Sequence, residues 1–191
     1  MREEVAELLA NKKDLLTITY FKLQKLFEKK YGKNTVVLME IGTFFEVYEV
    51  NNDEEKIGKA KEIAELLNIQ LTRKNKSILE NSKENPIMAG VPAISLEKHL
   101  ARIIAEQKYT VVLIKQKGIP PNVTRYLDTV VSPGTNFDFV LDQDENNITS
   151  LLVDQIRGIY LVGYSAIDVT TGKCYYNEVH GTSEDKFFAL D

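Results

Sequence analysis

The sequence predicts an α+β fold in which a mixed β-sheet carries packed helices. Segments with helical periodicity and β-rich apolar runs follow one another irregularly, without the regular strand–helix repeat of a purely parallel sheet. The 191 residues, 43% of them hydrophobic and 27% charged, suffice for one large core or two small ones. We expect two small domains.

The first third of the chain predicts a helix followed by two strands. Apolar residues recur at helical spacing over residues 20–31, and Gly32 supplies a stop. Residues 35–41 form a β-rich apolar run. After Gly42, the extended pattern resumes over residues 44–50.

The middle of the chain predicts two further helices and several short strands. Apolar side chains from Ile57 to Leu67 line one face of a helix. Ser95 is placed to cap a second helix over residues 95–106. A polar loop over residues 73–85, followed by an apolar segment between two prolines, separates the two helices. Strands are expected over residues 69–72, 109–115 and 125–131.

An acidic segment without periodicity, which contains the run DQDENN, marks the predicted domain boundary. We predict a first domain over residues 1–136, an acidic linker over residues 137–147 and a second domain over residues 148–191. The second domain should contain a tight turn at Thr171 and Gly172 and a helical start near Ser183. Its strands are expected over residues 149–153, 160–169 and 173–179.

The net charge argues against a free-standing domain that grips duplex DNA through phosphates alone. It is formally −4, with a pI near 5.4. Positive residues are nevertheless grouped, and we expect a locally positive face on an acidic body. Solvated lysines without a ligand are the alternative for each single residue. The three basic sets are Lys22, Lys25, Lys29, Lys30 and Lys33; Arg73, Lys74 and Lys76; and Lys108, Lys115, Lys117 and Arg125.

The cysteine content and the absence of long apolar runs predict a soluble, cytoplasmic protein. One cysteine, Cys174, excludes an internal disulfide, and we expect a buried, inert thiol in reducing surroundings. The first residues interleave charges with short apolar runs, unlike a signal peptide. No apolar run is long enough for a membrane span.

The stretch IGTFFEVY, residues 41–48, sets an aromatic ring and a carboxylate two residues apart just after a glycine. In an extended backbone, Phe44 and Glu46 project to the same side. The ring offers a stacking face and the carboxylate a hydrogen-bond acceptor, a pairing that suits a nucleic-acid base better than a phosphate. The alternative is a half-buried strand in which Phe44 and Tyr48 face the core and Glu46 is solvated.

This stretch resembles the Phe-x-Glu mismatch-reading motif of the bacterial MutS family, whose usual form is Gly-Asp-Phe-Tyr-Glu. Further matches follow in the family's order. They are AELLNIQLT at residues 64–72, PIMAGVP at residues 86–92 with the helix after it, and VVSPGT at residues 130–135. The resemblance covers residues 19–140 and continues over residues 160–179.

The resemblance implies that this part of the chain reads DNA by a minor-groove wedge. Phe44 would stack on a mispaired or unpaired base while the duplex kinks, and Glu46 would accept a hydrogen bond from that base. Basic residues would hold the phosphate backbone without reading sequence. The residues expected to support DNA contact are Thr43, Arg73, Lys74, Lys76 and Lys117.

The resemblance also implies a longer protein around these residues. Family members are homodimers, act on double-stranded DNA with mismatches or small loops, and work with a MutL-like partner. Their ATPase, which uses ATP and Mg²⁺, lies near the C-terminus, and no GxxxxGK[ST] loop occurs here. We therefore expect neither enzymatic activity nor a cofactor or metal ion in this part. Residues after the linker would begin a ribonuclease-H-like α/β connector domain.

Departures from the family pattern leave the preferred lesion open. Thr43 replaces the usual aspartate and Phe45 the usual tyrosine, and the triplet at residues 93–95 is Ala-Ile-Ser where the family commonly has Tyr-His-Ala. One alternative is a protein-docking module that kept the fold and lost DNA contact. A less favoured alternative is a metal-dependent nuclease using Asp168, whose simpler role is to support the turn at Thr171 and Gly172.

Overall fold

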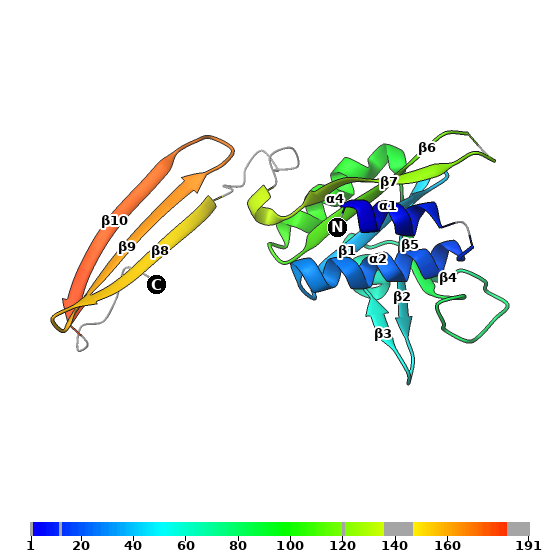
Figure 1. Cartoon of the computed structure of the whole chain (residues 1–191), viewed down its shortest axis with the longest axis horizontal. Helices are drawn as coiled ribbons and strands as arrows, with labels where there is room; N and C mark the ends of the chain where they lie inside the picture. Colours follow the sequence, from blue (N-terminus) through cyan, green and yellow to red (C-terminus); the bar gives the residue numbers. More distant parts are fainter. Residues whose placement is uncertain (1, 12, 120, 136–146, 183–191) are drawn as a thin grey trace. The chain divides into compact units, whose positions relative to one another are not determined.

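A mixed β-sheet with helices on both faces forms the first of two units, Met1–Thr135 and Asn136–Asp191 (Figure 1). The computed structural model describes residues 2–11, 13–119, 121–135 and 147–182. The α+β class and the mixed sheet predicted from the sequence are confirmed.

The sheet of the first unit contains seven described strands: β1 (Thr35–Ile41), β2 (Phe44–Asn51), β3 (Lys56–Gly58), β4 (Thr72–Arg73), β5 (Ile87–Pro92), β6 (Thr110–Lys117) and β7 (Thr124–Val131). They lie in the order β4-β5-β2-β1-β6-β7, and β3 pairs with β2. Strands β1 and β6 are parallel, with Val37 beside Val112. The other described pairs of this sheet are antiparallel.

Helix α2 (Leu16–Tyr31) packs its apolar stripe onto one face of the sheet. Tyr20, Leu23 and Phe27 recur at helical spacing and are fully buried. The Tyr20 hydroxyl donates to the Val37 carbonyl oxygen at 2.8 Å, which fixes the helix against β1. The helix ends at Gly32 as predicted, because its left-handed φ of 94° favours glycine.

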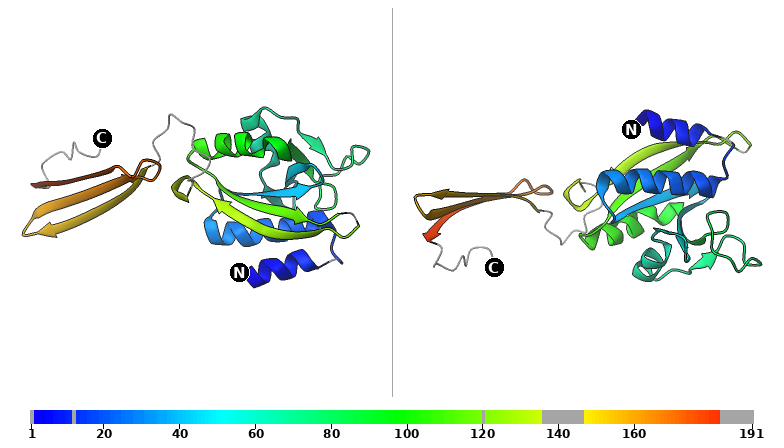
Figure 2. Two further views of the ribbon diagram at one scale, coloured as in Figure 1. Left: turned by 90° about the horizontal axis from the view of Figure 1, so that it is seen from above. Right: turned by 60° about the horizontal axis from the view of Figure 1, so that its bottom comes forward.

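Helices cover both faces of the sheet (Figure 2). Helix α1 (Arg2–Ala10), which the sequence did not predict, buries Val5 on the same side as α2 and lies against β7. Helices α3 (Ala60–Leu67) and α4 (Leu96–Ala105) pack on the strands of the sheet, with α4 on the side opposite α1 and α2. Strands β1, β2 and β6 are therefore buried on both faces along much of their length.

Three local predictions were wrong in detail. Ile57 lies in β3, paired with Val50, and α3 begins only at Ala60, because strand pairing decides a short apolar run that fits either period. The Ser95 hydroxyl does not cap α4; it donates to the Pro92 carbonyl oxygen within a short 3-10 turn, η1 (Ala93–Ser95). The strand expected over residues 69–72 is reduced to β4, two residues long.

The second unit contains a three-stranded antiparallel sheet in the order β10-β9-β8. Its strands are β8 (Asn147–Ile156), β9 (Ile159–Asp168) and β10 (Cys174–Thr182). Arg157 and Gly158 form a two-residue turn between β8 and β9, both with positive φ, as a tight hairpin requires. Residues 136–146, most of the predicted linker, and the helical start predicted near Ser183 lie outside the described residues. The ribonuclease-H-like connector stays a prediction.

The thiol of Cys174 is exposed at the start of β10, so the prediction of a buried thiol was wrong. Strand β10 lies at the edge of its sheet, and most of its described side chains are exposed. Among the described helices, none combines the length and apolar character that a membrane span requires.

Glu62 on α3 connects this helix to the start of β6. Its carboxylate accepts hydrogen bonds from the ammonium groups of Lys108, at 2.5 Å, and Lys59, at 3.2 Å. Burial raises the pKa of Glu62, but hydrogen bonds from Lys108, Tyr109 and Lys59 outweigh it and lower this pKa to about 2. The folded state therefore favours the ionised carboxylate.

We predict that Glu62→Gln lowers the free energy of unfolding at neutral pH. The pKa of Glu62 is lowered on folding, so its contribution is present above the unfolded value of about 4.3 and disappears as the pH falls towards about 2. Because the side chain is 37% exposed, solvent screening keeps the effect below about 1 kcal/mol. Urea unfolding near pH 7 and near pH 3 measures it, with Glu65→Gln on the same helix as control. If Glu62→Gln lowered the free energy of unfolding by the same amount near pH 3 as near pH 7, this role of the ionised carboxylate would be contradicted.

Candidate functional site

The hairpin between β1 and β2 presents Phe44 at one end of the sheet. Ile41 faces Phe44 across a two-residue turn, and Gly42 takes a left-handed φ of 62°. The Gln116 amide of β6 donates to the Gly42 carbonyl oxygen at 2.7 Å, and the backbone N–H of Ala93 donates to the Thr43 carbonyl oxygen at 2.8 Å. The turn is thus held by β6, which pairs with β1, and by the residue directly after β5, which pairs with β2.

Phe44 and Glu46 project from the same face of β2. Phe44 is 45% exposed as a residue, and Glu46 is more covered, with 13% of its side chain exposed. Both lie beside Gly90 of β5, where an added Cβ would be 3.5 Å from Glu46 Cγ and 3.7 Å from Phe44 Cδ1. The sequence had left open a half-buried strand in which Phe44 and Tyr48 face the core and Glu46 is solvated. Tyr48 is indeed buried. Phe44, however, is exposed and Glu46 is largely covered, so this alternative is not found.

Tyr48 and Lys74 surround the Glu46 carboxylate. The Tyr48 hydroxyl donates a short hydrogen bond to Glu46 Oε2. The Lys74 ammonium lies 3.4 Å from the same oxygen and 3.1 Å from the Tyr48 hydroxyl. Burial, followed by the hydrogen bond to the Glu46 carboxylate, raises the pKa of Tyr48 far above its usual range. The hydroxyl therefore remains a donor at working pH.

Arg125 on β7 adds a half-buried positive charge that acts on Tyr48, Glu46 and Glu40. Its Nε donates to the Glu40 carbonyl oxygen at 3.4 Å. Burial lowers the pKa of the guanidinium, which nevertheless stays charged. The sequence grouped Arg125 with other basic residues and did not single out Tyr48. The spacing of Glu46 and Tyr48, two residues apart on one strand, was a signal that could have identified the latter.

The loop after β4 carries Lys74 and is organised by the buried side chain of Asn85. Asn85 Oδ1 accepts from the backbone N–H of Asn75 at 2.7 Å. Its amide nitrogen donates to the carbonyl oxygens of Ile78 and Glu80 at 3.1 and 3.0 Å. These bonds close the loop on itself and fix the backbone next to Lys74.

The other predicted contact residues are dispersed. Thr43 and Lys76 are exposed at the hairpin tip and in the loop. Strand alternation directs Arg73 to the sheet face opposite Lys74, and Lys117 to the face opposite Gln116. Only Lys74 among the predicted basic residues contacts Glu46 in the described structure.

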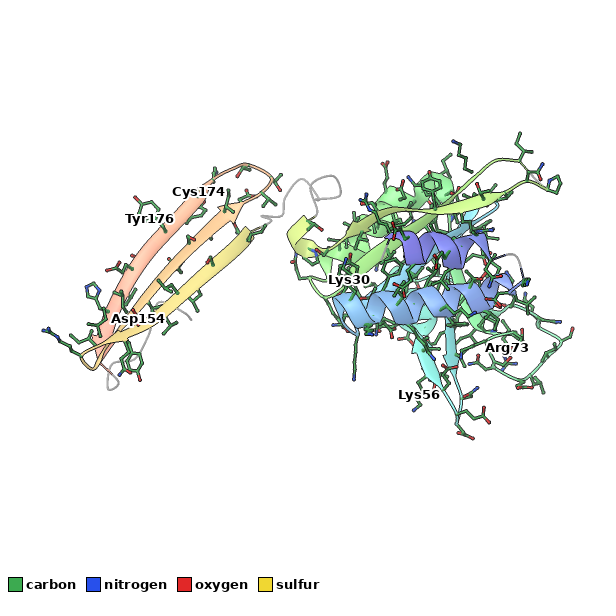
Figure 3. All side chains as sticks on the ribbon, viewed as in Figure 1. Lys30, Lys56, Arg73, Asp154, Cys174 and Tyr176 are labelled. Atoms are coloured by element: carbon green, nitrogen blue, oxygen red, sulfur yellow. The ribbon has the colours of Figure 1, made fainter. Side chains whose placement is uncertain are left out.

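Two of the three basic sets lie apart in the first unit, and the locally positive face that we expected stays a prediction. Figure 3 shows Lys30 at the end of α2 and Arg73 beside β4, at opposite ends of the first unit. Several of the lysines are also paired with carboxylates, which neutralise them locally. These pairs are Lys22 with Asp14, Lys25 with Glu55, Lys74 with Glu46, Lys108 with Glu62, and Lys115 with Asp128.

A groove of about 1190 Å³ runs between α1, α2 and β7. Its walls include Val5 and Leu127, and charged residues such as Asp14 and Arg125 reach it. Neither the exposed ring of Phe44 nor the carboxylate of Glu46 lines this groove. The hairpin therefore remains the better candidate, because it brings an exposed ring, an acceptor and a cation together.

Asp168 takes the turn-supporting role expected of it. Its carboxylate accepts hydrogen bonds from the Thr170 backbone N–H and the Thr171 hydroxyl. Its carbonyl oxygen accepts from the Gly172 N–H at 2.7 Å. In the part of the chain that the structure describes, no three His, Cys, Asp or Glu side chains are grouped so as to hold a metal ion.

Comparison with known proteins gives consistent matches. A family model described as MutS domain I matches residues 20–140. The chain is 30% identical over 188 residues to a putative DNA mismatch repair protein mutS homolog of Acanthamoeba polyphaga mimivirus, covering 95% of this chain and 16% of that protein. It is 29% identical over 163 residues to the DNA mismatch repair protein MutS of Halothermothrix orenii, covering 83% and 16%. The chain thus spans about a sixth of the length of these relatives.

We predict that Asn85→Ala accelerates amide hydrogen exchange in the loop over residues 73–85, most clearly at Asn75. The substitution removes the buried partner of three backbone groups, and each lost bond weakens local structure by about 1 kcal/mol. Exchange monitored by NMR or mass spectrometry measures the effect. Ser82→Ala, which removes one hydrogen bond to Asn85, is the milder control. Unchanged protection at Asn75 would exclude Asn85 as the organiser of the loop.

Proposed function

Because this chain belongs to the MutS family, through a mismatch-recognition domain of the kind its motifs predicted, we propose that it reads mispaired or distorted duplex DNA within a longer protein. A role in DNA mismatch repair follows from the family. The observation that carries the finer proposal is the exposed ring of Phe44 beside the Glu46 carboxylate on a fixed hairpin.

Phe44 is proposed to act as a wedge in the minor groove. A phenylalanine that is 45% exposed leaves apolar surface in water, and stacking on a base would bury that surface. The hydrogen bonds from Gln116 and Ala93 fix the hairpin, so little of it has to become ordered on binding. A mismatch stacks poorly, which lowers the cost of kinking the duplex there compared with a matched site.

Glu46 is proposed to discriminate between mismatched and matched DNA. Its carboxylate can accept a hydrogen bond from an N–H group of a displaced base. Near the phosphates of an ordinary duplex, the same negative charge is repelled and finds no compensating donor. The residue therefore weakens binding to matched DNA more than it strengthens binding to a mismatch.

Phosphate contacts are proposed for residues around this hairpin. Lys74 is the best supported, because its ammonium lies beside Glu46 and its side chain is 38% exposed. Thr43, Arg73, Lys76 and Lys117 are further candidates, which would position the duplex without reading sequence.

The wider activity of the protein is proposed from family membership alone. It comprises ATP hydrolysis with Mg²⁺ outside these residues, homodimer formation and cooperation with a MutL-like partner. The second unit is proposed to begin a ribonuclease-H-like connector domain.

A protein-docking module is the second candidate function. The net charge of −4 and the pairing of several lysines with carboxylates favour it, since both weaken attraction to phosphates. Substitution of Phe44 discriminates between the two functions. In a docking module that has lost DNA contact, this substitution would not change DNA binding.

We predict that Phe44→Ala in the full-length protein removes most of the preference for mismatched over matched duplex. The loss of one base–aromatic stack corresponds to roughly 1–3 kcal/mol. Fluorescence anisotropy on two duplexes that differ by a single mispair measures the ratio of affinities. Tyr126→Ala is a matched control, because Tyr126 is 43% exposed and alternation directs it to the face of β7 opposite Arg125. An unchanged ratio in Phe44→Ala would remove this residue from the site.

We predict that Glu46→Gln raises the affinity for matched duplex and lowers selectivity. The amide keeps a hydrogen-bond acceptor but removes the repulsion between the carboxylate and the phosphates. Titrations at two salt concentrations measure both affinities, and Glu54→Gln, in the turn after β2, controls for the loss of one negative charge. A fall in matched-duplex affinity would instead give Glu46 a supporting role in the fold.

A further inference from the structure

The carboxylate of Glu46 is held through one of its two oxygens. The Tyr48 hydroxyl and the Lys74 ammonium both lie at Oε2. Among the described residues, none donates a hydrogen bond to Oε1. One oxygen is therefore engaged inside the protein, and the other remains as an acceptor for a ligand.

We propose that Tyr48 is a positioning residue whose hydroxyl fixes Glu46 so that Oε1 alone is offered to an N–H donor of a displaced base. The inference deepens the proposed function and rests on the role given there to Glu46. Tyr48 itself makes no contact with the base in this account. It acts through the direction in which it holds the carboxylate.

The position of the Tyr48 hydroxyl is set by the core. The ring is fully buried and packs edge-on against Tyr20, with 4.9 Å between ring centroids and an interplanar angle of 78°. Backbone pairing of β2 with β5 places Tyr48 opposite Met88, so the strand cannot slide. The hydroxyl consequently reaches Glu46 from a ring that has little freedom to move.

The bond from Tyr48 is better suited than the bond from Lys74 to hold Glu46 during DNA binding. The Lys74 ammonium is 3.4 Å from the carboxylate, and its long side chain is 38% exposed. A phosphate that approaches the hairpin would compete for this ammonium. The phenol carries no charge, is buried, and keeps its proton because burial raises its pKa. It therefore continues to hold Oε2 when Lys74 turns towards DNA.

Loss of the hydroxyl would make Glu46 less selective. Without a fixed partner, the carboxylate rotates among several rotamers and offers either oxygen in more than one direction. The hydrogen bond to a base then pays a larger ordering cost at a mismatch, while the repulsion from matched DNA is little changed. The ratio of affinities for mismatched and matched duplex should fall, with the fold retained.

The test is Tyr48→Phe in the full-length protein, measured by anisotropy on mismatched and matched duplexes. We expect the ratio of affinities to fall by about 2- to 12-fold, the range for one hydrogen bond. Tyr109→Phe is the control, because it removes a phenol hydroxyl from a largely buried residue whose partners are Lys108 and Glu62 and not Glu46 or Tyr48. Tyr109→Phe should leave the ratio unchanged, even where it lowers the thermal midpoint.

A double-mutant cycle with Glu46→Ala shows whether Tyr48 acts through Glu46. In the Glu46→Ala background, Tyr48→Phe should no longer change the ratio. An equal change in both backgrounds would overturn the inference, and so would a Tyr48→Phe variant that weakens both duplexes equally. Retention of the full mismatch preference by Glu46→Ala alone would instead refute the proposed function of Glu46.

Glu46→Asp tests the same hydrogen bond by changing its acceptor instead of its donor, and it does not disturb the core. Aspartate keeps the charge, but its carboxylate is one methylene too short to reach both the Tyr48 hydroxyl and the position of Oε1. We expect a fall in the ratio similar to that of Tyr48→Phe. An aspartate variant with the full ratio would overturn the inference, because the fixed position of the carboxylate would then not matter.

Discussion

The burial of Tyr48 against Tyr20 is the constraint on which the candidate site depends. It fixes which face of β2 is turned towards α2, and the period of two along a strand then places Glu46 and Phe44 on the same face. A slip of one residue would instead send Phe45 and Val47 to that face, and both are buried on the other side. The large free energy of core packing therefore sets the direction of two side chains at the edge of the core.

The proposed wedge also needs a backbone that does not yield when its ring is pressed against a duplex. The hairpin of Phe44 is tied to β6 by Gln116 and to the turn after β5 by Ala93. On the neighbouring side, Asn85 closes the loop that carries Lys74. Hydrogen bonds from segments far apart in the sequence thus support Phe44, Glu46 and Lys74, which would limit the ordering cost of the proposed binding.

The charge distribution suits the proposed discrimination between duplexes better than it suits tight binding to DNA. The chain is acidic overall, and several lysines are neutralised by neighbouring carboxylates. The cation beside the candidate site, Lys74, is itself paired with the Glu46 carboxylate. Sequence-independent attraction to phosphates is therefore weak in this part of the protein, and contacts specific to a distorted base would have a proportionally larger share of the selectivity.

The sequence by itself determined the strands at residues 35–41 and 44–50, the helix stop at Gly32, the mixed fold class and the family. Each rests on a local pattern: a period of two, a glycine, or motifs in a fixed order. The common side of Phe44 and Glu46 follows from the same period.

Only the tertiary structure decided features that arise between distant segments. Ile57 fits both a helix and a strand, and pairing with β2 selected the strand. Helix α1 forms because Val5 finds a core beside β7, and the exposure of Cys174 depends on what covers the faces of its sheet. Lys74 reaches Tyr48, 26 residues away, because β4 and β2 both pair with β5. A local sequence pattern cannot predict such a contact, since strand order and packing bring these side chains together only when the sheet forms.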